Sequence, residues 1–389
     1  MKICDLTQFY SPVSGGVKRY IEQKVAYIER RSPEDRHILV IPGEKTSSEK
    51  RGNSQVYTIE SPLVSKTSRY RMLLNLCAVE EILEAEKPDI AESGDPYQLA
   101  WKAIVSGRAL GIPIVGFYHS HFPEAYIRSV AKYFGSISVQ IAEEISRRYV
   151  RSLYNHFERT MVPSPALAAL LTEWGVESVE NIDLGVSVET FFPDDSRAKN
   201  TRNELGIPQD AFLLVYAGRL ASEKNVRTLF SAFELLNDTK KSFHLLCIGD
   251  GTQRSLLRKL QKNSSKVHWL PYCSDAKRLA DLYRTADLFV HPGVQETFGL
   301  VSLESQACGT PVVGIRGSYM DRIIYNGQME WASENTPQAL ARAIEETAET
   351  NTREAGERAS KLVRERYSWD HVFDRLFSVY RSVIADYKN

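Results

Sequence analysis

The sequence predicts an α/β protein built from two Rossmann-like domains, each with a parallel sheet covered by helices. Three observations carry this prediction. Short apolar runs such as residues 212–217 are typical of strands buried on both faces, and amphipathic helical stretches separate them. Glycines such as Gly15-Gly16 and Gly218 stand where a strand leads into a helix or loop. The 389 residues also exceed what one compact core usually holds.

The elements follow one another as strand, turn and helix along most of the chain, which favours parallel pairing. We place the crossing between the domains near residues 188–200, where Phe192-Pro-Asp-Asp195 leads into the charged stretch 197–204. Strands are expected at 2–6, 37–41, 56–59, 90–91, 114–118, from 160, 212–217, 243–248, within 267–273 together with the loop that leaves it, 286–290 and 311–315. Helices are expected up to residue 30, at 70–86, 97–110, 124–158 with a break near 135, from after 165 through 174–175, after 226, up to 262, at 279–285, within 337–365 and from 369.

Composition and charge are those of an ordinary globular protein. Apolar residues make up 43% of the chain and charged residues 25%. The formal net charge is zero, so no overall field attracts nucleic acid, and we expect no such partner. The five cysteines have no metal-like spacing. Because we find no signal peptide and no apolar run of membrane-spanning length, we expect a cytoplasmic protein, at most peripheral to the inner face of a membrane.

The stretch 291–311 carries the main functional signal. It lies between two expected strands, and Leu300, Leu303 and Ala307 have helical spacing before Gly309 ends the helix. Unpaired N–H groups and the helix dipole favour an anion where this helix begins.

Two carboxylates, Glu296 and Glu304, bracket that helix start. If the whole span were helical, a rise of about 1.5 Å per residue would place them roughly 12 Å apart. This exceeds the ~5 to 9.5 Å between paired carboxylates in glycosidases. We therefore interpret them as separate acceptors for hydroxyls of one extended ligand, with a phosphate between them. An acidic loop before an amphipathic helix, with Glu304 on its solvated face, remains the alternative.

Two cations follow the expected strand 212–217. Arg219 and Lys224 stand five apart after Gly218, so they could hold a diphosphate from two sides, Arg as a fork and Lys as a point charge. Such charges would stabilise the negative charge that develops on a leaving diphosphate. Glu223 is expected to orient one of them, and a plain surface loop is the alternative.

These motifs resemble the family 4 retaining glycosyltransferases over nearly the whole chain. The likeness rests on the Glu296 and Glu304 spacing with Phe298-Gly299 inside it, on residues 307–311, and on the Gly-Arg-x-x-x-Glu-Lys loop. It implies a GT-B fold, in which two Rossmann-like domains face each other across a cleft. It also implies a UDP- or GDP-sugar donor and transfer with retention, without metal or other cofactor. The implied domains are 1–190 joined by a crossover helix 369–389, and 191–368.

The resemblance assigns donor-binding roles by position. Glu296 would bind hydroxyls of the donor sugar, Glu304 would bind the ribose, and His119 would contact the sugar near its 6-position. The expected catalytic set is His119, Arg219, Lys224 and Glu296. The other implied donor contacts are Gly15 and Gly16 at the diphosphate, the backbone near Cys273 at the base edge, and the amides of Phe298, Gly299 and Leu300 at the phosphates.

The acceptor side is expected in the first domain. His119 and His121 follow the strand 114–118 and would point the same way, but no third ligand is near, so we reject a metal site. We assign His121 to the acceptor or to orienting its loop. Arg128 and Lys132 stand among tyrosines in the helical region that follows, which suits an anionic or phosphate-bearing surface; a solvated helix face is the alternative.

Two classes of acceptor remain open, a membrane lipid or other amphiphile and a soluble sugar or small metabolite. Tyr319, in a segment where many family members carry Gly-Gly, would narrow the acceptor preference. The alternatives to a transferase are a nucleotide-sugar epimerase, a phosphorylase of the same fold, or a nucleotide-sugar-binding protein without catalysis. The cofactor-lysine context of a phosphorylase and the extra carboxylates usual in an epimerase are not found, and the intact cations and glutamates argue against lost catalysis.

Overall fold

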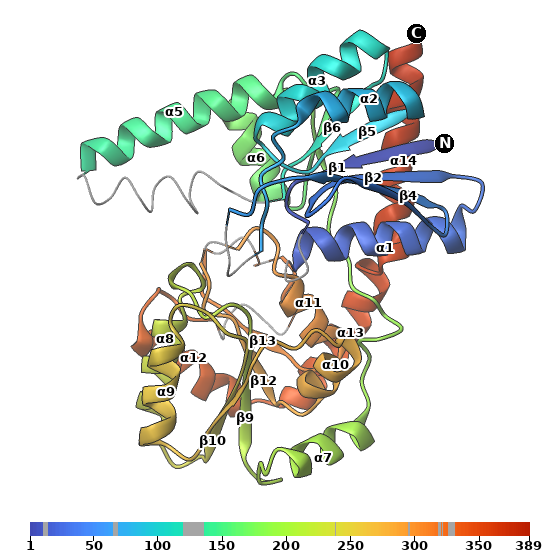
Figure 1. Ribbon diagram of the computed structural model, residues 1–389. Coiled ribbons are helices and arrows are strands. Elements are labelled where there is room, and N and C mark those ends of the chain that lie inside the picture. The colour runs from blue at the N-terminus through green and yellow to red at the C-terminus, as the bar shows by residue number, and fades with distance from the viewer. Residues whose placement is uncertain are drawn as a thin grey trace. The chain divides into compact units, whose positions relative to one another are not determined.

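The computed structural model describes residues 1–10, 15–64, 69–119, 136–237, 239–294, 296–317, 320, 322–325 and 331–389. Tertiary contacts divide the chain into two units, Met1–Leu184 with Trp369–Asn389, and Gly185–Ser368. Each unit is a mainly parallel sheet with helices on its faces (Figure 1), as the sequence predicts.

The first unit has one sheet with the strand order β3-β4-β2-β1-β5-β6-β7-β8 within the described residues. Neighbouring strands pair in parallel, except for the antiparallel pair of β3 and β4. Helices α2 and α3 pack together on the face opposite α1 (Figure 1). The strands are β1 (Lys2–Leu6), β2 (Arg36–Gly43), β3 (Ser47–Arg51), β4 (Ser54–Glu60), β5 (Ile90–Ser93), β6 (Ile114–Phe117), β7 (Arg159–Val162) and β8 (Val179–Asn181). The helices are α1 (Gly16–Arg31), α2 (Leu76–Glu86), α3 (Gln98–Leu110), α5 (Ser136–Tyr154), α6 (Pro165–Glu173) and α14 (Trp369–Lys388).

The structure departs from the sequence prediction at several elements of this unit, and one of them is the short strand β8, where no strand was predicted. The edge strand β3 was not predicted, because its residues are all exposed and lack the apolar alternation that marks a strand. Helix α2 begins later than expected, because Asn75 caps it: the Asn75 side chain accepts the backbone N–H of Ala78. The part of the expected helical region 124–158 that precedes residue 136 lies outside the described residues.

A fully buried lysine ties α1 and α14 to this sheet. Lys24 Nζ donates to Asp5 Oδ1 at 2.8 Å, to Glu92 Oε1 at 3.2 Å and to the Tyr380 hydroxyl at 3.0 Å. The Tyr380 hydroxyl also donates to Glu92, and the Tyr20 hydroxyl does so at 3.1 Å. Each buried charge therefore has partners, which offsets the cost of removing it from water.

The network shifts the pKa values of two of its carboxyl groups in opposite directions. Burial alone would raise the pKa of Asp5, but Lys24 and His37 outweigh it and lower that pKa to about 2. Burial raises the pKa of Glu92, against the pull of Lys24, and the neighbouring Asp5 raises it further. Since Tyr380 comes from α14, the last helix supplies part of the polar core of the first unit.

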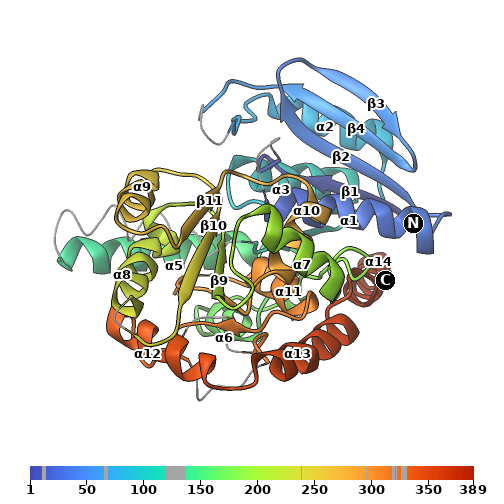
Figure 2. The same ribbon diagram turned by 90° about the horizontal axis from the view of Figure 1, so that it is seen from below.

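The second unit has a parallel sheet with the order β11-β10-β9-β12-β13 in the described part of the chain. Helices α8, α9 and α12 cover one face, and α7, α10, α11 and α13 cover the other (Figure 2). The strands are β9 (Phe212–Ala217), β10 (Phe243–Ile248), β11 (Val267–Leu270), β12 (Leu288–Val290) and β13 (Val312–Val313). The helices are α7 (Asp195–Glu204), the 3-10 turn η3 (Ser222–Lys224), α8 (Val226–Leu236), α9 (Arg254–Asn263), α10 (Ala276–Arg284), α11 (Leu300–Ala307), α12 (Pro337–Ala348) and α13 (Thr352–Arg366).

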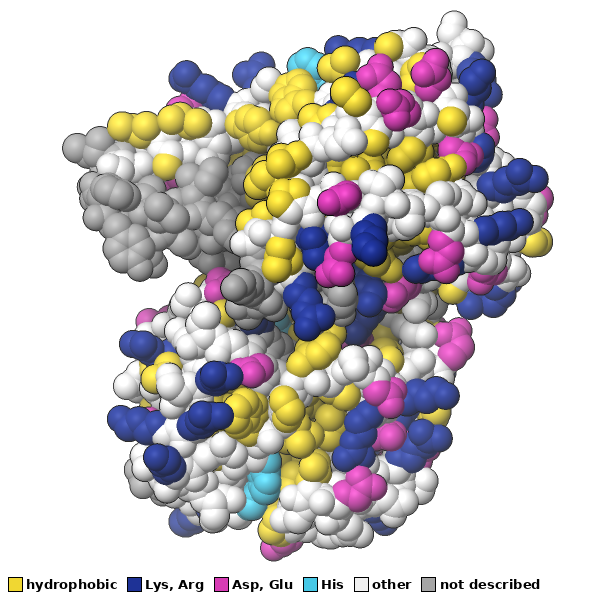
Figure 3. Space-filling model, in the orientation of Figure 1, with side chains coloured by type: hydrophobic (Ala, Val, Ile, Leu, Met, Phe, Trp, Pro, Cys, Tyr) yellow, Lys and Arg dark blue, Asp and Glu magenta, His cyan; other side chains and the backbone are white. Residues whose placement is uncertain are grey.

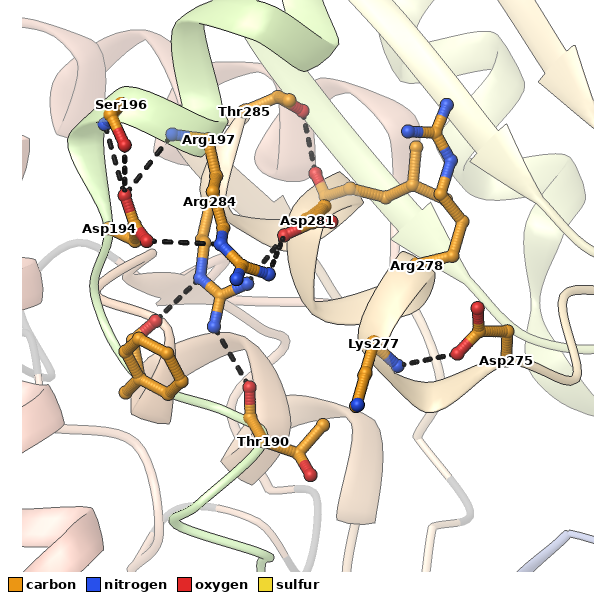
Figure 4. Close-up of polar contacts among 12 residues, drawn as sticks. Thr190, Asp194, Ser196, Arg197, Asp275, Lys277, Arg278, Asp281, Arg284 and Thr285 are labelled. Carbon is orange, nitrogen blue, oxygen red and sulfur yellow. Dashed lines mark hydrogen bonds and ion pairs between the residues drawn. The ribbon is translucent and has the colours of Figure 1, made fainter.

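The segment that opens the second unit is held there by a buried arginine. Arg284 of α10 donates to the carbonyl oxygens of Phe192 at 2.6 Å and Thr190 at 2.9 Å, and pairs with Asp281 at 2.6 Å (Figure 4). The N–H of Val186 also donates to the carbonyl of Tyr367, at 2.7 Å. These contacts explain why the division falls after Leu184, whereas the sequence places it after residue 190.

Surface charge is mixed in sign. On the face seen in Figure 3, cationic and anionic side chains are interspersed over the described surface, as the net charge of zero leads one to expect. None of the helices in the described ranges is both long enough and apolar enough to cross a membrane.

Candidate functional site

The candidate donor site lies at the carboxyl edge of the second sheet. Because β9, β10 and β12 are parallel, the loops that follow them emerge at the same edge, where α/β proteins bind ligands. Two of these loops are in close contact: a Cβ on Gly249 would lie 2.0 Å from the carbonyl oxygen of Gly218, and φ of Gly249 is +135°. Only glycine fits there, so the loop after β9 packs directly against the loop after β10.

Arg219 and Lys224 occupy the loop after β9. Arg219 is 60% exposed and pairs with Glu223 at 3.4 Å, so Arg219 is the cation that Glu223 contacts. Lys224 ends the turn η3, and Asn225 follows it with φ of +55°. The Asn225 side chain donates to the carbonyl of Pro292 at 2.8 Å, which ties this loop to the loop after β12.

The structure brings three polar side chains together between those two loops. Lys224 Nζ lies 2.5 Å from Glu296 Oε2, and His291 Nε2 lies 3.7 Å from the same oxygen. Lys224 and Glu296 are 27% and 21% exposed, so the pair is partly open to solvent. Burial alone would raise the pKa of Glu296, but the Lys224 ammonium and His291 outweigh it and hold that pKa well below its usual range. Glu296 is therefore an ionised acceptor at neutral pH.

The start of α11 is formed by a glycine in the left-handed conformation. Gly299 caps the helix with φ of +85°, and a Cβ there would lie 2.4 Å from the sulfur of Met320, so glycine is required. The Phe298 ring is buried, 6.1 Å from the Tyr367 ring and 5.5 Å from the guanidinium of Arg322. Its side chain is thus a packing element, while the amides of Phe298 and Gly299 precede the helix and that of Leu300 opens its first turn. Because α11 begins at Leu300, Glu296 stands in a loop and the all-helical separation does not apply.

Glu304 is buried rather than solvated. It is 2% exposed, and the Tyr283 hydroxyl donates to its Oε2 at 3.3 Å. The alternative that places Glu304 on a solvated helix face is therefore wrong: α11 presents it toward α10.

In the first unit, His119 lies after the end of β6. Its ring stacks on Phe117 with centroids 4.1 Å apart and meets the Tyr20 ring edge-on at 5.0 Å. Burial, with the Lys24 charge, lowers the pKa of His119 to about 3. The imidazole is therefore neutral at pH 7 and can act as a hydrogen-bond partner, not as a cation.

Other candidate residues have simpler surroundings. Gly15 caps α1 with φ of −94°, and a Cβ there would meet nothing within 4 Å, so no described neighbour requires glycine. Gly16 is the first residue of α1. Cys273 follows β11 and its thiol lies 3.4 Å from the carbonyl of Asp275. The acceptor-side candidates His121, Arg128, Lys132 and Tyr319 lie outside the described residues.

Two residues of the site had no role in the sequence prediction. His291 directly follows a buried strand, and that position could have marked it as a site residue. Its partner Glu296 could not be predicted, because their contact depends on how the loop after β12 folds back. Tyr283 reaches Glu304 from α10, 21 residues earlier in the chain, and no local pattern marks it. Among the described residues, no group of three or more His, Cys, Asp or Glu side chains could hold a metal ion.

The arrangement combines exposed positive charge, a helix start and an ionised carboxylate at one sheet edge. Such a set can hold a diphosphate and the hydroxyls of an attached sugar. Comparison with known proteins agrees with this chemistry: residues 14–190 match the model of Glycosyltransferase Family 4, and residues 197–366 match that of Glycosyl transferases group 1. The chain belongs to the family 4 glycosyltransferases.

Relatives of this glycosyltransferase include two mannosyltransferases. It is 28% identical over 350 residues to a GDP-mannose-dependent alpha-(1-6)-phosphatidylinositol dimannoside mannosyltransferase of Mycobacterium tuberculosis, covering 88% of this chain and 87% of that one. It is 24% identical over 322 residues to a GDP-mannose-dependent alpha-mannosyltransferase of Corynebacterium glutamicum, covering 81% and 72%. Among solved structures, sucrose-phosphate synthase from Thermosynechococcus elongatus superimposes with a TM-score of 0.78 at 19% identity, covering 99% of each chain. That likeness shows the GT-B fold.

This family 4 enzyme is thus a retaining glycosyltransferase that moves a sugar from a nucleotide-diphosphate sugar to a hydroxyl acceptor. The comparisons do not favour an epimerase or a binding protein without catalysis.

Proposed function

We propose that this glycosyltransferase transfers mannose from GDP-mannose to a hydroxyl of a lipid-linked acceptor. The observation that carries the donor assignment is the group Lys224, Glu296 and His291 beside the start of α11. The choice of GDP-mannose is supported by the names of the two relatives described above, and the choice of a lipid by the phosphatidylinositol dimannoside in one of them.

In this proposal the donor is bound mainly by the second unit. The amides at the start of α11 and the exposed Arg219 hold the diphosphate, and Lys224 leaves Glu296 to join them. Glu296 then accepts hydrogen bonds from hydroxyls of the sugar, and the buried Glu304 accepts from the ribose. Gly15 and Gly16 allow a backbone approach to the diphosphate, and the neutral His119 bonds the sugar near its 6-position.

The bond changes need no protein nucleophile. The acceptor oxygen bonds to the anomeric carbon on the face from which the diphosphate leaves, as the bond from that carbon to the phosphate oxygen breaks. The proton of the acceptor hydroxyl passes to a diphosphate oxygen. Arg219 and Lys224 stabilise the charge that develops on the leaving diphosphate.

A donor and acceptor screen tests this proposal. The purified enzyme is incubated with GDP-mannose, GDP-glucose, UDP-glucose and UDP-N-acetylglucosamine, each with a phosphatidylinositol-type glycolipid, with diacylglycerol and with soluble sugars, and products are read by mass spectrometry. We expect mannosyl transfer to the glycolipid and slow release of GDP without acceptor. Transfer only to a soluble sugar would contradict the lipid acceptor, and use of UDP-sugars alone would contradict the donor.

We also propose that transfer requires no metal ion, because Arg219, Lys224 and the start of α11 supply the positive charge at the phosphates. Activity is therefore expected to survive a molar excess of EDTA over total metal, with initial rates measured before and after addition. Complete loss with EDTA that Mn²⁺ or Mg²⁺ restores would contradict this, since it would place a cation at the diphosphate.

A lipid acceptor requires a surface that meets the membrane, and we propose α5 for this contact. Ile141 and Ile145, one helical turn apart on α5, are 55% and 62% exposed, and hydrophobic side chains are visible over α5 in Figure 3. Arg148 continues the same stripe, although Glu144 pairs with it and with Arg147. An exposed apolar stripe that ends in cations suits the boundary between headgroups and acyl chains.

Sedimentation with vesicles tests this surface. The wild type is expected to pellet with anionic phosphatidylglycerol vesicles, and Ile141→Ser/Ile145→Ser to remain largely in the supernatant because it loses apolar area. Leu235→Ser, on α8 of the second unit and also exposed, is the control and should pellet like the wild type. Wild type that stays in the supernatant even at low salt would argue for a soluble acceptor instead.

A further inference from the structure

One oxygen of Glu296 stands between two nitrogen donors. Oε2 lies 2.5 Å from Lys224 Nζ and 3.7 Å from His291 Nε2. The proposed function takes Lys224 to the diphosphate, so Glu296 loses its nearest counter-charge at the step where its orientation toward the sugar matters. A carboxylate that is 21% exposed gains only part of the compensation that water would give. Some fixed group must then hold it.

The ring of His291 is fixed by its surroundings. The residue is 4% exposed, and its backbone N–H donates to the carbonyl of Val313 at 2.9 Å, which anchors the end of β12. The loop closes over the ring: a Cβ on Gly293 would lie 2.9 Å from His291 Cε1, so a side chain there would displace the imidazole. A ring enclosed in this way cannot follow a moving partner, and it provides a stationary donor.

The surroundings also select the tautomer. His291 Nδ1 is buried and has no hydrogen-bond partner among the residues that the structure describes. A proton on Nδ1 would therefore be a buried, unsatisfied N–H, which is costly. A proton on Nε2 faces the Glu296 carboxylate instead. Of the two neutral tautomers, the surroundings therefore favour the one that carries its proton on Nε2 and directs it at Glu296.

We propose that His291 is a positioning residue that holds Glu296 through Nε2–H when Lys224 moves to the donor diphosphate. This inference rests on the proposed roles of Lys224 and Glu296. At 3.7 Å the two atoms are too far apart for a hydrogen bond while Lys224 is paired, and a small shift of the carboxylate toward the ring forms one when Lys224 leaves. Glu296 Oε1 then remains available for sugar hydroxyls, and His291 itself touches no part of the donor.

Two substitutions separate this role from simple packing. In His291→Gln the amide NH₂ stands near the position of Nε2 and can still donate to Glu296, whereas in His291→Asn it stands near Nδ1 and cannot reach. Both variants remove the ring, so they share any packing defect. We expect kcat/KM for the sugar nucleotide to fall by about tenfold or more in His291→Asn and to be largely retained in His291→Gln. The Kd for GDP, which lacks the sugar, should be unchanged in both, and this also shows that both are folded.

A second measurement asks whether the effect passes through Glu296. In a Glu296→Gln background, His291→Asn is expected to cause no further loss of kcat/KM, because the carboxylate that His291 positions has been removed. Equal losses in His291→Asn and His291→Gln, wild-type kcat/KM in His291→Asn, or an undiminished loss in the Glu296→Gln background would each overturn the inference. These results leave the transferase function intact as long as the wild type turns over a sugar nucleotide. A wild type that turns over none would overturn the proposed function and this inference together.

Discussion

Lys224→Ala is expected to lower kcat by about 10²-fold or more, because it removes a preorganised charge from the place where the leaving diphosphate becomes negative. The fold should be retained, since Lys224 lies on a turn and is partly exposed in its pair with Glu296. Steady-state kinetics with saturating acceptor measures kcat, and circular dichroism with thermal melting checks the fold. Arg219→Ala is expected to show a loss of the same order, because Arg219 would act on the same phosphates.

Lys262→Ala provides the matched control for this prediction. Lys262 is an exposed lysine in the last turn of α9 in the same unit, so its removal changes the net charge equally and should leave kcat unchanged. Turnover near that of the wild type in Lys224→Ala would refute the assignment of Lys224 to the diphosphate.

Lys24→Met is expected to lower the free energy of unfolding by about 3–5 kcal/mol, the range for removing one partner of a buried ion pair. Methionine has a similar length but leaves the buried Asp5 and Glu92 without their shared cation. The midpoint of urea denaturation, followed by far-UV circular dichroism at pH 7, measures the effect. The folded-state pKa of Asp5 lies below its usual value, so the stability that Asp5 contributes is present above about pH 4 and is lost as the pH falls toward 2.

Lys18→Met is the control for the buried lysine. Lys18 also lies on α1, but its pair with Glu22 is at 3.7 Å and partly exposed, and such pairs contribute about 0–1 kcal/mol. If Lys24→Met destabilised the protein no more than Lys18→Met, the network would not hold α1 and α14 in the way described. Lys24→Met/Glu92→Gln should recover part of the loss, because one of the two stranded carboxylates is then neutral.

The sequence predicts a strand or helix well where the apolar residues of that element show that it is buried. The apolar run 212–217 predicts β9 to the residue, and the strand at 243–248 is found as β10, because both are buried on two faces. The strand β3 carries no such signal, since it is exposed and lies at the edge of the sheet, where β4 is its one neighbour among the described strands. Its strand conformation depends on pairing with β4, which no local pattern encodes.

The same limit applies to the site. The loop after β9 and the start of α11 could be located because glycines, cations and glutamates stand at fixed offsets from strands. The pairing of Lys224 with Glu296 joins residues 72 apart, so the sequence could name both without placing them together. The burial of Lys24 could not be predicted from the sequence at all, because it depends on Glu92 and on Tyr380, which are 68 and 356 positions away.

The contribution of α14 to the first unit has a consequence for how the enzyme is made. Residues 185–368 are continuous, so the second unit can fold as soon as they have left the ribosome, whereas the first unit must wait for the last helix. Until Tyr380 is synthesised, Lys24 and Glu92 each lack one of their hydrogen-bond partners inside a forming core, although they keep each other, Asp5 and Tyr20. The unit translated first is therefore completed last, and a message truncated before codon 369 yields a chain whose N-terminal half is left open to chaperones and proteases.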